Sequence, residues 1–237
     1  MSDDLLAGID CGATKVMVQS GVYSSKTNKI SPGSINHEFY YSDHPDWNSK
    51  FIPVSLDIQK SEYQSDNISL SYEEINQGKV IIDTIVSSIE IIEDHKIGLC
   101  FPGLKDRDGI VVMANGPRIP DLLHRIKSVK TILNDSDCCV VGELKSTIGL
   151  MQDTRNGIYI GGGTGIADGI ILNGEILNLT NTVGVPRCWE INVSSNETVE
   201  TLLSPAGMIR KYNDQNNEKI KVLADLVHKK EFNNIMD

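Results

Sequence analysis

The sequence predicts an α/β protein in which helices cover a sheet, because strand patterns and helix patterns alternate along the chain. Residues 72–94 have apolar side chains at helical spacing, at Ile81, Ile82, Ile85, Ile89 and Ile92. Residues 96–103, KIGLCFPG, are a short apolar run that stops at a Pro-Gly pair, as a buried strand does. Strand patterns return over residues 156–177 and are followed by two short helical patterns.

The remaining elements follow from local pattern. Residues 5–23 indicate two strands joined by a turn, and residues 24–74 are polar and indicate long loops with one or two exposed strands. The best strand candidate in that polar segment is FIPVSLDI, residues 51–58. Further on, the patterns predict a short helix over 121–128, a strand over 129–135, a longer helix over 136–153, an Asn-Gly turn at 173–174, and helices centred on 207–213 and 221–227.

Composition limits the classes of function. The chain has 237 residues, 40% of them hydrophobic and 23% charged, which is typical of a globular protein with one large domain or two modest ones. Its net charge of -10 argues against a nucleic-acid partner, because binding phosphates requires clustered Lys and Arg. No apolar run reaches the length of a membrane span, and the acidic N-terminus does not resemble a signal peptide. The five cysteines form no CxxC pair, so we expect reduced thiols in a cytoplasmic protein.

The first motif with chemical content is DCGATK, which runs from Asp10 to Lys15 at the end of a predicted strand. Gly12 would let backbone N–H groups approach an anion, Thr14 could donate a hydroxyl hydrogen bond, and Asp10 could hold Mg²⁺ through water. A tight hairpin that happens to contain Asp and Lys explains the motif about equally well.

The second motif is GGGTGIADGIILNGEIL, residues 161–177. A glycine-rich hairpin is one interpretation. A backbone that a phosphate must approach closely is the other, and it explains better why five glycines crowd residues 161–169, where each weakens a strand by up to about 1 kcal/mol. On the phosphate interpretation GGGTG exposes successive backbone N–H groups and Thr164 supplies a hydroxyl.

The third motif places Asn134 and Asp135 at the end of a strand and just before a helix, in LNDSDCCVVGE. The carboxyl ends of strands are where α/β sheets carry functional sites, and Asp135 could take a proton from a substrate hydroxyl that Asn134 orients. Asn and Asp are also ordinary N-caps, and taken alone the cap is the stronger interpretation, by roughly two to one.

In their order and spacing these motifs resemble the ROK family of sugar kinases, part of the actin, hexokinase and Hsp70-like ATPase superfamily. AGIDCGATK is similar to that family's first phosphate loop, of the type D-x-G-x-T-K, and IGLCFPGLKDRDGIV to its strand-Pro-Gly segment. NDSDCCVVGE matches N-D-A-N-A-A-A-x-G-E at Asn134, Asp135, Gly142 and Glu143. GGGTGIADGII resembles the second phosphate loop.

The resemblance implies an actin-like ATPase fold of two ribonuclease-H-like domains, here residues 1–117 and an incomplete 118–237, with an ATP cleft between them. It implies ATP and Mg²⁺ as cofactors, a small-molecule sugar as substrate, Asp135 as general base and Asn134 as a sugar contact. The phosphate and Mg²⁺ site would use Asp10, Gly12, Thr14, Lys15, Gly163, Thr164 and Gly165. Dimers are common in such proteins, so a homodimer is an assembly that the resemblance allows.

The chain also departs from the family pattern. Residues 183–208 contain no histidine and a single cysteine, Cys188, so we expect the zinc site of many ROK proteins to be absent. VETLLSPAG still resembles the segment that follows the zinc motif, which makes Glu200 the counterpart of a sugar-binding glutamate. Glu190 could replace an earlier sugar-binding glutamate, or be an exposed strand residue beside Trp189. Asp168 stands where glycine is common, and could either help to hold Mg²⁺ or repel phosphate.

The chain ends before the family's adenosine-binding Gly-Gly segment, and no glycine follows Gly207. We expect a fragment of a longer protein, with a natural short form as the alternative. Two other functions stay open: a non-catalytic sugar sensor related to the family's repressors, and a kinase of a non-sugar hydroxyl. The absence of room for a DNA-binding helix-turn-helix ahead of Asp10, and the retained Asp135, favour the sugar kinase.

Overall fold

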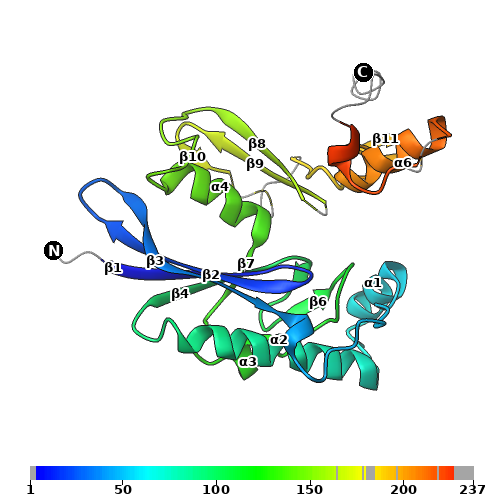
Figure 1. The fold of residues 1–237 in the computed structure, drawn as a ribbon, viewed down its shortest axis with the longest axis horizontal. Coiled ribbons are helices and arrows are strands. Elements are labelled where there is room, and N and C mark those ends of the chain that lie inside the picture. Colours follow the sequence, from blue (N-terminus) through cyan, green and yellow to red (C-terminus); the bar gives the residue numbers. More distant parts are fainter. Residues whose placement is uncertain are drawn as a thin grey trace. The chain divides into compact units, whose positions relative to one another are not determined.

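The computed structural model describes residues 4–163, 165–177, 179, 185–195, 197–217 and 219–226 (Figure 1). Contacts divide the chain into two compact units. The first consists of residues up to 138 together with 145–152, and the second consists of 139–144 together with the residues from 153 onward. The predicted domain boundary between residues 117 and 118 falls inside the first unit, because a later strand joins the first unit's sheet.

That sheet has five strands in the order β3-β2-β1-β4-β7. The strands are β1 (Asp4–Cys11), β2 (Lys15–Ser24), β3 (Lys29–Tyr40), β4 (Lys96–Phe101) and β7 (Ile132–Asn134). The first three are antiparallel neighbours, whereas β4 pairs in parallel with both β1 and β7. The carboxyl ends of β1, β4 and β7 therefore meet at one edge of the sheet. The α/β prediction is confirmed in this mixed sheet.

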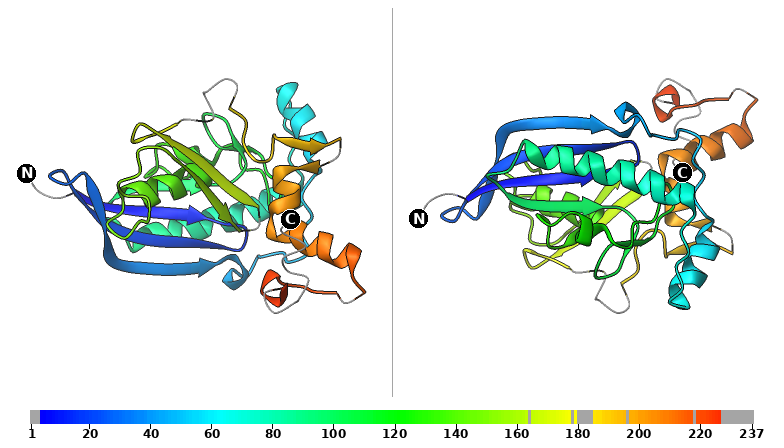
Figure 2. Two further views of the ribbon diagram at one scale, coloured as in Figure 1. Left: turned by 90° about the horizontal axis from the view of Figure 1, so that it is seen from above. Right: turned by 90° about the horizontal axis from the view of Figure 1, so that it is seen from below.

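Helix α2 (Tyr72–Glu90) runs along one face of this sheet, as Figures 1 and 2 show. It begins where the helical spacing predicts, because the Ser71 hydroxyl accepts a hydrogen bond from the Glu74 N–H at 3.1 Å and caps it. The predicted apolar stripe is buried: Ile85 is fully enclosed in a core that includes Ile9 and Leu99. Burial of this stripe is the main reason that α2 is stable.

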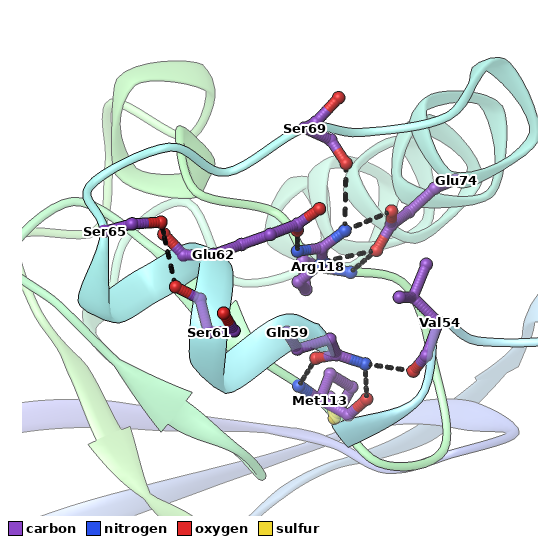
Figure 3. A network of polar contacts seen from close by, with 9 residues as sticks. All are labelled: Val54, Gln59, Ser61, Glu62, Ser65, Ser69, Glu74, Met113 and Arg118. Atoms are coloured by element: carbon purple, nitrogen blue, oxygen red, sulfur yellow. Dashed lines mark hydrogen bonds and ion pairs between the residues drawn. The ribbon is translucent and has the colours of Figure 1, made fainter. Parts of the chain in front are cut away.

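The polar segment 24–74 was the least predictable part of the chain, and the expected strand over residues 51–58 is wrong. Residues 51–55 have no regular structure, and α1 (Leu56–Gln64) follows them. The side chain of Gln59 is buried and binds the backbone of Met113, donating to its carbonyl at 2.9 Å and accepting from its N–H at 2.7 Å (Figure 3). This contact joins residues 54 positions apart, so no local pattern could reveal it.

The rest of the first unit consists of short elements. They are the 3₁₀ helix η1 (Tyr41–Asp43), the hairpin strands β5 (Leu104–Lys105) and β6 (Ile110–Val112), and helix α3 (Leu122–Arg125). Helix α4 (Asp135–Lys145), whose residues 139–144 belong to the second unit, is shorter than the helix expected over 136–153. It ends because Ser146 forms a β-bridge with Ile30 and the Thr147 N–H donates to the Ile30 carbonyl at 2.8 Å.

The second unit contains a three-stranded antiparallel sheet made of β8 (Gly157–Gly162), β9 (Ile166–Leu172) and β10 (Glu175–Ile176). Asn173 and Gly174 join β9 to β10 with φ of 55° and 85°, which confirms the predicted Asn-Gly turn. The remaining elements are β11 (Asn192–Ser194), β12 (Glu197–Thr198), α5 (Val199–Leu203), α6 (Pro205–Gln215) and η2 (Leu223–Leu226). Helix α6 was predicted, whereas the expected helix over 221–227 is a 3₁₀ turn in its described part.

Candidate functional site

The turn between β1 and β2 is the first predicted phosphate loop. The Gly12 N–H donates to the Lys15 carbonyl at 3.0 Å, which closes the turn. Tyr41 supports it from behind, because its hydroxyl donates to the Gly12 carbonyl at 3.1 Å and its N–H donates to the Thr14 carbonyl at 3.1 Å. Burial raises the pKa of this tyrosine well above its ordinary value, so the hydroxyl keeps the proton that it donates. Thr14 and the Asp10 carboxylate are exposed beside this supported turn.

Lys15 has a different partner from the predicted phosphate. Its ammonium group forms an ion pair with Glu38 on the neighbouring strand and lies 5.6 Å from the centre of the Tyr40 ring. The Tyr40 hydroxyl donates to the same Glu38 carboxylate at 2.5 Å. The hydrogen bond with Glu38 raises the pKa of Lys15, and its counterpart lowers the pKa of Glu38. The phosphate role of Lys15 stays a prediction that would need this exposed pair to open.

The parallel pairing brings the first and third motifs to one place. Asp10 is in register with Cys100 at the end of β4, and Phe101 is in register with Asn134 at the end of β7. The predicted Mg²⁺ ligand Asp10 and the predicted base Asp135 thus come from the same edge of one sheet. An exposed carboxylate at a strand end suits a Mg²⁺ ion held through water, since Mg²⁺ binds few protein oxygens and keeps several waters.

Asn134 caps helix α4. Its side-chain oxygen accepts from the N–H of Ser136 at 3.0 Å and from the N–H of Asp137 at 3.4 Å, as an N-cap does. The interpretation of Asn134 as a cap is therefore confirmed, while its sugar contact stays a prediction. Asp135 is the first residue of the helix, is half-buried, and accepts from the Ser136 N–H at 3.0 Å. A carboxylate at this position gains from the partial positive charge of the helix N-terminus.

Three further side chains that sequence reasoning did not assign lie beside these carboxylates. The Cys100 thiol donates to Asp10 Oδ1 at 3.3 Å, and Cys138 lies in the first turn of α4. Lys105 lies within electrostatic range of Asp135, although burial, the larger effect, lowers the pKa of its ammonium group. The neighbouring Cys138 thiol, together with burial, raises the pKa of Cys100. The only sequence signal for this group was that cysteines replace alanines of the family pattern.

A cavity of about 110 Å³ adjoins the first loop within the first unit. Its polar lining comes from Asn48, Gln77 and Asn115, and its apolar lining includes Trp47 and Phe101. Two hydrogen bonds join Gln77 and Asn48. The Asn48 N–H donates to the Gln77 side chain at 3.2 Å, and the Gln77 amide donates to the Asn48 carbonyl at 3.3 Å. The tryptophan inside the otherwise polar segment 24–74 was the one signal that could have indicated this cavity.

The second glycine-rich segment is a hairpin, as one of the two interpretations held. Gly162 pairs with Ile166, and the Gly163 N–H donates to the Gly165 carbonyl at 2.9 Å across the tip. Thr164 lies outside the described residues. A Cβ on Gly165 would lie 3.0 Å from the Glu200 carboxylate, whereas among the described residues no atom lies within 4 Å of the corresponding point on Gly163. Glu200 thus lies close to Gly165, while Gly163 leaves room for a ligand among the described residues.

Packing also explains Gly169. A Cβ at this position would collide with the side chain of Val140, which helix α4 places against β9. Gly169 is therefore explained by packing and, contrary to the expectation for all five glycines of this segment, does not support phosphate binding.

Asp168 has protein partners for its charge, whereas its position beside the predicted phosphate loop had suggested either a Mg²⁺ ligand or a group that repels phosphate. It is buried, forms an ion pair with Arg187 at 3.1 Å, and accepts from the Cys188 N–H at 2.6 Å. The same guanidinium group donates to the Asp168 carbonyl at 3.0 Å and lies 5.3 Å from the centre of the Trp189 ring. Through this ion pair and this hydrogen bond, Asp168 attaches the segment around Cys188 to β9. The charge of Asp168 is balanced by Arg187.

The two predicted sugar-binding glutamates lie on this fastened segment. The Glu190 carboxylate accepts from the Arg187 N–H at 2.8 Å, so it closes a local turn although it is exposed. Glu200 lies in the first turn of α5, and its N–H donates to the Cys188 carbonyl at 3.2 Å. The segment that Asp168 fastens therefore also sets the position of Glu200 beside Gly165.

Asp168→Asn is expected to destabilise the second unit by about 1.5–3 kcal/mol, because it removes the charge from a hydrogen bond to a buried guanidinium. Urea unfolding followed by the fluorescence of Trp189, in a Trp47→Phe background, measures this unit. The control is Asp214→Asn, which makes the same charge change at an exposed position of α6. Equal midpoints for the two variants would contradict the fastening role.

Among the described residues, no group of three or more His, Cys, Asp and Glu side chains is arranged to hold a metal ion. No helix in the described part of the chain combines the length and the apolar character that crossing a bilayer requires.

Comparison with known proteins supports the fold. No family model and no curated protein matches the sequence. A ROK family glucokinase from Streptomyces griseus, solved with glucose and AMPPNP, is 20% identical with a TM-score of 0.54 over 90% of this chain and 61% of its own. A Listeria monocytogenes protein proposed to be an N-acetylmannosamine kinase is 17% identical with a TM-score of 0.58 over 98% and 74%.

A ROK family transcriptional regulator, a homologue of the E. coli MLC protein, is also similar, at 14% identity and a TM-score of 0.55 over 94% of this chain and 54% of its own. The chain therefore spans between about half and three quarters of the length of these structures. At these identities the likeness concerns the fold alone. The described chain has the α/β fold of the ROK sugar kinases, as its motifs predicted.

Proposed function

We propose that this chain phosphorylates a hydroxyl group of a sugar, a hexose or an N-acetylhexosamine, with ATP and Mg²⁺. One observation carries the proposal: Asp10 and Asp135 come from the carboxyl edge of one parallel strand set, in a protein with the fold of ROK sugar kinases. Phosphoryl transfer needs little covalent chemistry from the protein, and depends on alignment and on neutralisation of charge. Two carboxylates at one sheet edge, one exposed and one half-buried, suit the two separate tasks of holding a cation and accepting a proton.

The residues of the first unit would act as follows. Asp135 accepts the proton of the sugar hydroxyl, and its hydrogen bond from the Ser136 N–H holds the carboxylate in place. Asn134 fixes the start of α4 and thereby the direction of Asp135. Asp10 would hold Mg²⁺ through water, and the Gly12 turn and the Thr14 hydroxyl would contact the phosphates of ATP. The chemistry that Mg²⁺ would supply there is neutralisation of the charge on the transferred phosphoryl group.

The second unit would contribute the other contacts. Gly163 has room for a phosphate to approach, and we propose the same contact for Thr164 and Gly165. Glu200, held beside Gly165, is the stronger candidate for a sugar hydroxyl. Glu190, whose carboxylate already accepts from the Arg187 N–H, is the second candidate.

The test is ADP release from ATP and Mg²⁺ in the presence of separate hexoses and N-acetylhexosamines, with mass spectrometry of the sugar product. We expect ADP release that depends on one sugar class and a product heavier by one phosphoryl group. Binding of the same sugars is measured by calorimetry on the same preparation. Sugar binding without turnover would favour the non-catalytic sensor, the function suggested by the likeness to the regulator. Turnover with a non-sugar alcohol alone would leave the chemistry in place and replace the substrate class.

A further inference from the structure

The cavity beside the first loop adjoins the edge of the sheet that carries the proposed site. Gly12 and Ala13 of the loop line it, and so does Phe101 at the end of β4. Phe101 is in register with Asn134, the residue before Asp135. The cavity and both proposed carboxylates therefore belong to the same strand ends of the first unit.

The lining of this cavity is neutral. Within the described part of the chain no Asp, Glu, Lys, Arg or His lines it, although 23% of all residues are charged. A phosphate, a carboxylate or an ammonium group would find no opposite charge there, and enclosing an unpaired charge is costly. The cavity therefore suits an uncharged group and is not a second place for the phosphates of ATP.

The size of the cavity limits that group further. Its volume is about 110 Å³, and its apolar wall includes the buried side chains of Ile81, Phe101 and Met113. An apolar cavity of about 150 Å³ holds a benzene ring, so this one is too small for a whole hexose ring. It has room for a substituent of a sugar, and an acetamido group, with its methyl, carbonyl and N–H, is of this size.

Two polar side chains of the lining are available to a ligand. The indole N–H of the half-buried Trp47 and the side-chain amide of the exposed Asn115 make no hydrogen bond within the described part of the chain. The Gln77 amide, in contrast, is already hydrogen-bonded to Asn48. A tryptophan N–H only donates, whereas an asparagine amide both donates and accepts. Together they match the carbonyl and the N–H of an amide.

We propose that this cavity receives the acetamido group of an N-acetylhexosamine, and that Trp47 and Asn115 select such sugars over plain hexoses. The methyl group packs against the apolar wall, the carbonyl accepts from the Trp47 N–H, and the amide N–H donates to the Asn115 side-chain oxygen. A hexose hydroxyl in the same place would leave the apolar wall in contact with water. This inference rests on the proposed function, whose substrate class it narrows.

The test is calorimetry of the chain with N-acetylglucosamine and N-acetylmannosamine, each paired with its parent hexose, glucose or mannose. We expect one acetylated sugar to bind about tenfold or more tightly than its parent, from two added hydrogen bonds and a buried methyl group. Trp47→Phe and Asn115→Ala should each lower this ratio about 2- to 10-fold and leave the affinity for the hexose unchanged. Asn67→Ala, at an exposed position of the first unit away from the cavity, is the matched control and should keep the ratio.

Fluorescence gives a second measurement that does not depend on turnover. In a Trp189→Phe background the emission comes from Trp47 alone, and the acetylated sugar should change it with the dissociation constant that calorimetry gives, whereas the parent hexose should not. Trp47 also stacks on Tyr41, so Trp47→Phe could disturb the fold. Asn115 lies in an exposed bend, and Asn115→Ala therefore tests the same pocket independently.

The outcomes separate this inference from the kinase function. Equal affinity for the acetylated sugar and its parent, or a preference that both variants keep, would overturn the acetamido pocket, and ADP release with a hexose would then leave the kinase standing. A preference that the variants lose, without any ADP release, would support the pocket and count against the kinase. Binding of neither kind of sugar would overturn both.

Discussion

Asp135→Asn is expected to lower kcat for sugar phosphorylation by about 10²- to 10⁴-fold, the range that a positioned general base contributes. Asparagine keeps the oxygen that accepts from the Ser136 N–H at 3.0 Å, so the start of α4 should stay intact. It cannot take up a proton, and the transfer step loses its base. Sugar affinity measured by calorimetry should change little, because the substitution acts on the reacting proton.

Asp137→Asn is the matched control for this prediction. It makes the same change of charge in the same first turn of α4, and Asp137 is half-buried like Asp135. Both variants lose a similar favourable interaction with the helix N-terminus, of about 0.3–1 kcal/mol. A fall in kcat that is equal in the two variants would show that charge near the helix end, and not proton transfer at Asp135, controls the rate.

Arg118→Met is expected to destabilise the first unit by about 3–5 kcal/mol, because it leaves a buried carboxylate without its charged partner. Arg118 is 1% exposed and donates to both oxygens of Glu74, at 2.8 and 2.9 Å (Figure 3). The same guanidinium group pairs with Glu62 on α1 and donates to the Ser69 carbonyl at 3.1 Å. A single side chain thus connects α1, the loop after it and the start of α2.

Urea unfolding followed by the fluorescence of Trp47 measures this effect, in a Trp189→Phe background so that only the first unit is observed. Trp47 is a suitable reporter because it stacks on the buried Tyr41, with ring centres 5.5 Å apart. Glu74→Gln combined with Arg118→Met should recover part of the loss, since the charge that needed a partner is then gone. A double variant as unstable as Arg118→Met alone would show that the packing of the arginine stem matters more than the ion pair.

Local patterns in the sequence were enough for the elements whose stability is local or that bury a regular apolar face. Helix α2 begins at its Ser71 cap and buries the isoleucines spaced along one side, and both features can be read without the fold. The Asn173–Gly174 turn needs positive φ angles, which these two residue types adopt at low cost. The motifs also identified Asp10, Asn134 and Asp135 as strand-end residues, because a strand followed by Asp or Asn and a turn or helix has a local signature.

What only the tertiary structure decided depends on contacts between distant residues. The buried Gln59 binds the backbone of the distant Met113 and so attaches helix α1, where the local pattern had predicted a strand over 51–58. The ion pair of Asp168 with Arg187 gives a partner to a charge that looked misplaced beside a phosphate loop. Gly169 is a glycine because Val140 occupies the space of a side chain. The sequence alone suggested the candidate residues for the chemistry, whose roles stay predictions. Parallel pairing across β1, β4 and β7 brings Asp10, Cys100 and Asn134 to one edge of the sheet. The order of the strands depends on hydrogen bonds and burial between segments far apart in the sequence, so a short stretch of sequence does not reveal it.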